Sequence, residues 1–135
     1  MNTPSKIASA AQPRAAKFLP RGLRILAAVV FLAAGVAKLV GVPEMVQAFE
    51  QIGVGQWFRI VTGIVELVGG IAILIPATAA LGGLLLSATM IGALLAHLFV
   101  IEGSPVPAIV LLLITATITW QHRPSRPAAA RLGRA

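Results

Sequence analysis

The chain has 135 residues, of which 58% are hydrophobic and 11% charged, with a net charge of +7 and a mean hydropathy of +0.93. A soluble domain typically carries about 25% charged and about 45–50% apolar residues, so this composition is that of one membrane domain. The absence of cysteine excludes a disulfide framework, a thiolate metal site and thiol redox chemistry carried by this chain.

The basic residues flank a hydrophobic block, and only Lys38 and Arg59 lie inside it. A nucleic-acid binder would cluster its basic residues on a folded face, so this distribution speaks against nucleic acid as a partner. It is typical of the cytoplasmic ends of a membrane protein. The flanking residues are Lys6, Arg14, Lys17, Arg21, Arg24, Arg123, Arg126, Arg131 and Arg134.

The N-terminal segment, residues 1–22, begins with Ala, Ser, Pro and basic residues and contains no acid, which predicts a disordered cytoplasmic tail. A signal peptide would also place an apolar stretch after basic residues. Three more apolar segments follow the first one, however, and this favours a first membrane span over a cleaved signal.

Four apolar segments follow in the chain: 23–40, 57–75, 79–101 and 106–120. A spanning helix needs roughly 17–25 residues, so the second and third qualify and the first is near the lower limit. The fourth is short, but the flanking "QHR" and the loop prolines can extend it into the headgroups. The turns at 76–78 and 102–107 are short, which predicts antiparallel neighbours.

The longer connection after the first span predicts a short amphipathic helix at the membrane surface. Pro43 can occupy the first turn, and Gly53 can end the helix. Met45, Val46, Phe49 and Ile52 fall on one face, and Glu44, Gln47 and Gln51 on the other. Trp57, Phe58 and Trp120 are placed like interfacial aromatics.

The predicted fold is therefore all-α: a four-transmembrane-helix antiparallel bundle over residues 23–122, with a short interfacial helix after the first span. A second basic tail, predicted to be disordered and cytoplasmic, occupies residues 123–135. An even number of spans with basic flanks predicts an integral protein of the bacterial cell membrane with both termini in the cytoplasm. The lipid bilayer is its first expected partner.

Glu66, in the segment "GIVELVGGIAILI", is the residue whose placement most needs explanation. It lies about 12 Å below the outer start of its span, where a carboxylate costs about 2.5–3.5 kcal/mol. Because side chains tilt toward the N-terminus of their helix, Lys38 and His97 are predicted to point toward the level of Glu66. Lys38, Glu66 and His97 are therefore the candidate ligand-binding residues, in the outer half of the bundle.

Structural explanations exist for most of these residues. Lys38 and Arg59 would each be satisfied by reaching the outer headgroups, and His97 by a backbone carbonyl. Glu66 would be satisfied by an ion pair with Lys38. Three threonines of the fourth segment are expected to bond their own backbone: Thr115, Thr117 and Thr119.

Glycines share helix faces with the polar residues, which favours an inward direction because small residues mark close helix contacts in lipid. Gly35 precedes Lys38, Gly63 and Gly70 flank Glu66, and Gly83 lies on the stripe that leads through Ser87 to His97.

Several kinds of active site are disfavoured. A haem held by two histidines needs both at one depth, but His97 is predicted near the outer face and His122 near the inner one. One histidine and one glutamate are few for a metal site. The sequence has no Gly-rich phosphate loop, nucleophile elbow or HExxH motif, so no autonomous active site is visible.

The succession "FLAAGVAKL", "GIVELVGGIAILI" and "MIGALLAH" resembles the DoxX-like family of small four-helix membrane proteins, over residues 23–120. The resemblance implies Lys38, Glu66 and His97 as the recurring polar residues, with Gly35, Gly69 and Gly70 as packing positions. It also implies a link to quinone reduction, to quinone-like compounds or oxidative stress, or to the assembly of other membrane proteins.

Two functions remain open. The first is a non-autonomous redox-associated subunit, with a pocket for a quinone-type ligand and a membrane oxidoreductase subunit as partner. The alternative is a non-catalytic assembly or interaction partner of another membrane protein, in which the polar triad is structural. No cofactor is indicated by a clear motif; quinone is the candidate. A proton path is unsupported because the inner half lacks matching titratable residues.

Overall fold

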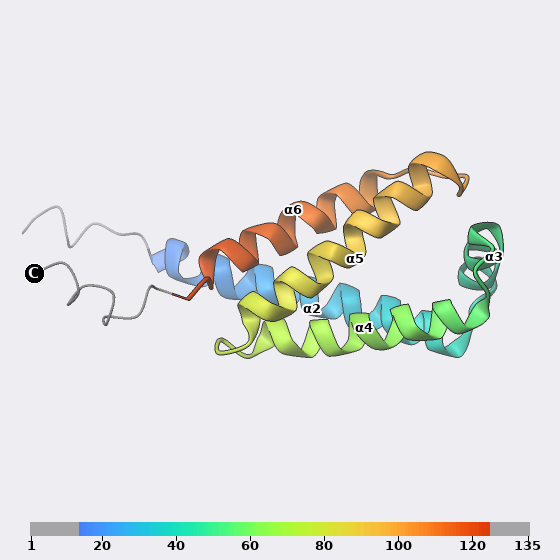
Figure 1. The fold of residues 1–135 in the computed structure, drawn as a ribbon. Coiled ribbons are helices and arrows are strands. Elements are labelled where there is room, and N and C mark those ends of the chain that lie inside the picture. The colour runs from blue at the N-terminus through green and yellow to red at the C-terminus, as the bar shows by residue number, and fades with distance from the viewer. Residues whose placement is uncertain (1–13, 125–135) are drawn as a thin grey trace, which may run out of the picture.

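The computed structural model of the protein describes residues 14–124, and these form five helices and no strand (Figure 1). Three helices, α2, α4 and α5, are long and apolar enough to cross a membrane, whereas α6 has 16 residues. The five helices follow the order predicted from the sequence. They are α2 (Arg14–Val40), α3 (Pro43–Ile52), α4 (Gln56–Leu74), α5 (Ala79–Phe99) and α6 (Val106–Gln121).

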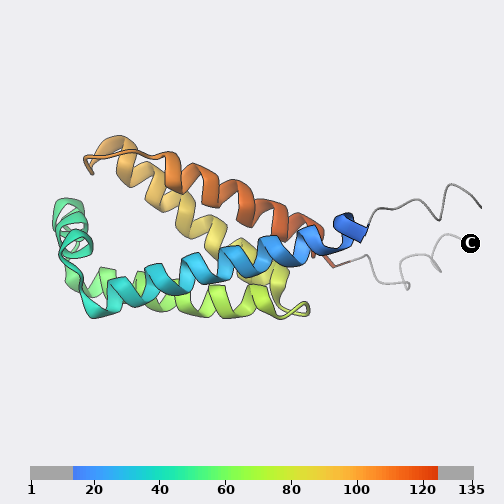
Figure 2. The ribbon, with the colours of Figure 1, turned by 180° about the vertical axis from the view of Figure 1, so that it is seen from behind.

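Helix α2 begins earlier than predicted. It starts at Arg14, so residues 14–22, predicted as part of a disordered tail, are helical. Ala, Arg, Lys and Leu are good helix formers, and they dominate this stretch. Pro20 lies inside the helix, and the first turns stand at an angle to the remainder (Figure 2), as a proline kink explains. The other tail residues, 1–13 and 125–135, lie outside the described part.

The long helices form two antiparallel pairs, α2 with α4 and α5 with α6 (Figures 1 and 2). The pairs meet near the turn between α4 and α5 and diverge toward the opposite end, where α3 lies across the molecule. We call the end where α2 begins and α6 ends the terminal end, and the opposite one the α3 end. Each of the four helices in these pairs places a large, fully buried apolar side chain in the core: Phe31, Ile73, Leu86 and Ile118.

Glycines allow the helix backbones to approach closely where α4 crosses its neighbours. A Cβ on Gly35 would lie 2.9 Å from the carbonyl oxygen of Gly63, which fixes the contact between α2 and α4. A Cβ on Gly82 of α5 would lie 3.0 Å from the carbonyl oxygen of Gly69 of α4. Such small-residue contacts drive helix association where lipid removes the hydrophobic force.

The outward faces of the long helices are apolar. Val68 of α4, Leu84 of α5 and Leu113 of α6 are each more than half exposed. On a soluble monomer an apolar surface of this extent would be unusual, so it fits contact with acyl chains.

Helix α3 has the features predicted for it. Pro43 lies in its first turn, and Gly53 ends it with a φ of 79°, in the left-handed region that favours glycine. Phe49 is buried and contacts Phe58 of α4 edge to face, with ring centroids 5.7 Å apart. The other apolar-face residues are half-buried, whereas Glu44, Gln47 and Gln51 are exposed.

Candidate functional site at the Lys38–Glu66 pair

Lys38 of α2 and Glu66 of α4 form an ion pair between two apolar helices. Lys38 Nζ donates a hydrogen bond to Glu66 Oε2 at 2.9 Å. The Glu66 side chain is 2% exposed and that of Lys38 12%, so the carboxylate is the more deeply enclosed partner. A buried carboxylate is costly unless it is paired, and Lys38 meets that requirement.

The glycine contact between α2 and α4 positions the ion pair. Gly35 lies one turn before Lys38, and Gly63 one turn before Glu66, so the close backbone contact is immediately beside the charges. A Cβ on Gly63 would lie 3.1 Å from the Cβ of Lys38. The missing side chains therefore set the separation at which the lysine reaches the carboxylate.

Arg59 has a structural role at the α3 end of this pair. Its Nη1 donates a hydrogen bond to the carbonyl oxygen of Lys38, and its Nε donates to Gln56 Oε1 at 2.7 Å. The guanidinium thus satisfies a carbonyl in the last turn of α2, where a positive charge is also favourable. Gly41, with a φ of +79°, leaves room for Arg59 Nη1, which would lie 3.3 Å from a Cβ there. Lys38 and Arg59 both have hydrogen-bond partners inside the protein. A contact with the outer headgroups is therefore not needed to account for either charge.

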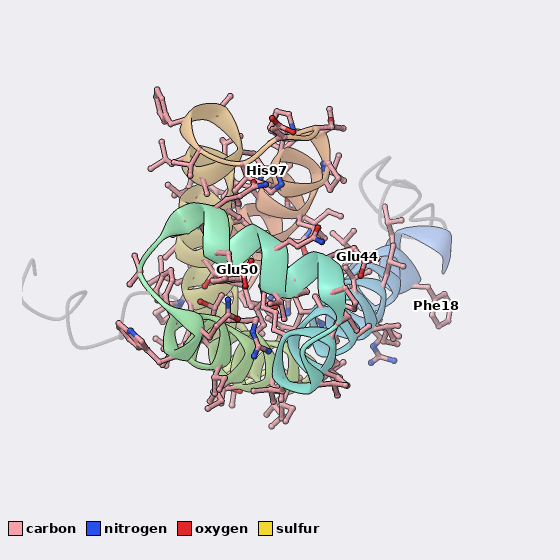
Figure 3. The ribbon with its side chains drawn as sticks, turned by 90° about the vertical axis from the view of Figure 1, so that its right-hand side faces the viewer. Phe18, Glu44, Glu50 and His97 are labelled. Atoms are coloured by element: carbon pink, nitrogen blue, oxygen red, sulfur yellow. The ribbon has the colours of Figure 1, made fainter. Side chains whose placement is uncertain are left out.

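His97 does not join the hydrogen bond between Lys38 and Glu66. Its Nδ1 lies 2.8 Å from the carbonyl oxygen of Ala93, four residues earlier on α5, and therefore carries the proton. In the view toward α3, His97 lies on the side of α5 and α6 (Figure 3), whereas α2 and α4 lie on the other. The pairs α2–α4 and α5–α6 have diverged near the α3 end, where His97 lies. Helical periodicity, on which the prediction was based, gives no information about such a divergence.

A second polar contact joins α5 to α6. Ser87 Oγ donates to Thr115 Oγ1 at 2.9 Å and also lies 2.7 Å from the carbonyl oxygen of Gly83. Thr115 is fully buried and bonds the Leu111 carbonyl at 2.9 Å. The sequence prediction gave Thr115 only its own backbone as partner. The position of Ser87 on the small-residue face of α5 was the signal that could have indicated the interhelical contact.

The other threonines of α6 behave as predicted. Thr117 and Thr119 bond the carbonyl oxygens of Leu113 and Thr115, on their own helix. A Cβ on Gly83 would collide with Thr119 Oγ1, so this glycine is a packing position between α5 and α6. A Cβ on Gly70 would lie 3.3 Å from the side chain of Leu32, which is closer than an ordinary van der Waals contact, so Leu32 would have to shift slightly.

Comparison with known proteins identifies the family of this chain. The model of the DoxX-like family matches residues 22–119. The chain belongs to the DoxX-like family. A relative from Bacillus subtilis (strain 168), named "Putative oxidoreductase CatD", is 29% identical over 73 residues, which are 54% of this chain. The match also covers 54% of that relative, so the chain spans about half of its length. No solved structure matches.

Proposed function

We propose that this DoxX-like membrane protein is a non-autonomous redox-associated subunit that binds a quinone-type headgroup at Lys38 and Glu66, for a partner oxidoreductase. The observation that carries the proposal is the ion pair itself, which places a lysine and a 2% exposed carboxylate between apolar helices. Ionisable residues within spanning helices are expensive and commonly functional. The name of the B. subtilis relative supports the redox association.

The residues match the chemistry of a quinone headgroup. The carbonyl oxygens of a quinone accept hydrogen bonds. The Lys38 ammonium has three N–H groups, and two remain to donate when one is hydrogen-bonded to Glu66. Reduction to the quinol takes two electrons, supplied by the partner oxidoreductase, and two protons, which Glu66 would relay. His97 keeps Nε2 available because its Nδ1 bonds Ala93, so it would contact the ligand from α5.

The proposal includes four membrane spans, with α6 as the fourth and both termini in the cytoplasm. Helix α6 is about 24 Å long at 1.5 Å per residue, below the roughly 30 Å hydrocarbon core, so the bilayer would thin beside it. Its terminal end carries Trp120 with the Arg123 guanidinium 4.0 Å from the ring centroid, a pair suited to the interface. The start of α2 lies at the same end (Figure 1).

A fusion reporter tests this topology. Green fluorescent protein fused after residue 124 is expected to fluoresce, and alkaline phosphatase fused in the loop at Gly103 is expected to be active. Active phosphatase fused after residue 124 would mean that α6 does not cross the membrane.

The closed geometry of the ion pair favours a second candidate, a non-catalytic assembly partner. Lys38 already occupies Glu66, and the Gly35–Gly63 contact beside it makes the pair resemble a structural lock between α2 and α4. In this candidate the apolar outer faces dock onto another membrane protein, and no small ligand enters.

Thermal unfolding of the detergent-purified protein with a soluble quinone distinguishes the two candidates. A quinone ligand is expected to raise the unfolding temperature of the native protein and to have little effect on Glu66→Gln. Glu102→Gln is the matched control, because Glu102 is an exposed glutamate in the α5–α6 loop. No quinone effect on the native protein, with Glu66→Gln markedly less stable, would support the assembly role instead.

A further inference from the structure

Arg24 of α2 has a guanidinium that is enclosed but unsatisfied. Its Nε and Nη1 are buried and have no hydrogen-bond partner among the described residues. Arginine is always charged, and a buried donor without a partner is costly. A native structure therefore needs an explanation for this side chain.

The residues around Arg24 form a small pocket at the terminal end. It has a volume of about 130 Å³ and is lined by Arg21, Arg24, Ile25 and Leu74, between the start of α2 and the end of α4. Ile25 is 57% and Leu74 42% exposed, so an apolar surface adjoins the two cations. The pocket lies where a membrane interface would meet the bundle.

Among residues 14–124, no carboxylate pairs with this charge. The sequence has four acidic residues: Glu66 pairs with Lys38, and Glu44, Glu50 and Glu102 belong to α3 and the α5–α6 loop.

We propose that this pocket binds the phosphate of an anionic phospholipid. A guanidinium donates two parallel hydrogen bonds to phosphate oxygens, a geometry that lysine does not reproduce. Arg21 adds a second positive charge near the headgroup. The acyl chains of the lipid would lie over Ile25 and Leu74. A free phosphate has no apolar part that could use these two side chains, so a phospholipid fits the pocket better.

The test uses the full chain, delipidated in a neutral detergent, with phosphatidylglycerol as the probe. Lipid retention is followed by native mass spectrometry and stability by thermal unfolding. The native protein is expected to retain the lipid and to unfold at a higher temperature when it is added. Arg24→Gln is expected to weaken retention about tenfold or more, and Arg24→Lys to weaken it less. Arg123→Gln is the matched control, since Arg123 stacks on Trp120 and does not line the pocket.

Stability without lipid separates a lipid site from an internal ion pair. Because no described group pairs with Arg24, Arg24→Gln is expected to unfold at the same or a higher temperature than the native protein in lipid-free detergent. A lower temperature would reveal an internal partner, such as the C-terminal carboxylate, and overturn the proposal. Equal lipid retention by Arg24→Gln would overturn it too, as would millimolar inorganic phosphate stabilising the protein as well as the lipid does.

Discussion

Arg59 donates a hydrogen bond to the backbone carbonyl of Lys38, while the side chain of Lys38 bonds Glu66 on the helix that carries Arg59. Two charge-assisted hydrogen bonds thus cross the same contact between α2 and α4. One satisfies the end of α2, and the other satisfies a carboxylate inside the bundle.

The ion pair predicts unequal effects of removing its two partners. Lys38→Met leaves the enclosed Glu66 carboxylate unpaired and is expected to cost roughly 3–5 kcal/mol of stability, less where the carboxylate takes up a proton. Glu66→Gln is expected to cost less, because Lys38 is near the end of its helix and can reach the headgroups. Denaturant unfolding in mixed micelles measures both.

The double variant Lys38→Met, Glu66→Leu is the control for this prediction. Replacing a buried ion pair by apolar side chains is often neutral, so most of the loss should be recovered. A double variant less stable than both single ones would show that the charges are not each other's main partners.

The Arg59 bond predicts a local effect at the α3 end. Arg59→Gln removes a charged hydrogen bond to the last turn of α2 and is expected to cost roughly 1–2 kcal/mol. Hydrogen exchange of the last turn of α2 should rise in this variant. Arg123→Gln, at the opposite end, should leave that exchange unchanged; equal effects of the two variants would contradict the capping role.

The contact between Gly35 and Gly63 predicts that a single methyl group disturbs the bundle. In Gly35→Ala the new Cβ would lie 2.9 Å from both the Gly63 carbonyl oxygen and Leu67 Cγ, an overpacking that typically costs about 1–3 kcal/mol. Gly92→Ala is the matched control, because nothing lies within 4 Å of that position. It should be neutral or stabilising by up to about 1 kcal/mol. Similar losses of stability in Gly35→Ala and Gly92→Ala would show that Gly35 is not in close contact with α4.

The hydrogen bond between Ser87 and Thr115 predicts energetic coupling of α5 to α6. A double-mutant cycle with Ser87→Ala and Thr115→Val should give about 0.6 kcal/mol, and at most about 1.7 kcal/mol, as for other hydrogen bonds between membrane helices. The cycle with Thr117→Val should show no coupling, since Thr117 is exposed and bonds Leu113. Coupling of equal size in both cycles would mean that the effect is not carried by the Ser87 hydroxyl.

The order and the approximate limits of the helices could be predicted from hydropathy, turn residues and the Pro43 and Gly53 caps. The start of α2 could not be predicted, because basic and small residues are common in disordered tails and are also good helix formers. Pro20 argued for a later helix start than the one observed, because proline is unfavourable inside a helix.

At the candidate site the sequence predicts the pairing of Lys38 with Glu66 but not the position of His97. The pairing follows from cost, because a carboxylate in an apolar helix needs a partner and few were available. The tilt between helix pairs depends on which glycines touch, and Gly82 against Gly69 sets the α4–α5 contact near the terminal end. Periodicity ranks the faces of a helix but does not give the angle between two helices.

The distance in sequence between Lys38 and Glu66, 28 residues, has a consequence for how the protein enters the membrane. The lysine leaves the ribosome before its carboxylate, and near the end of its span it can reach the headgroups. The Glu66 carboxylate lies well inside α4, where an unpaired charge costs about 2.5–3.5 kcal/mol in the translocon scale. Helix α4 is therefore expected to insert against the first span, where Lys38 is already in place, and Lys38→Leu should lower the insertion efficiency of α4.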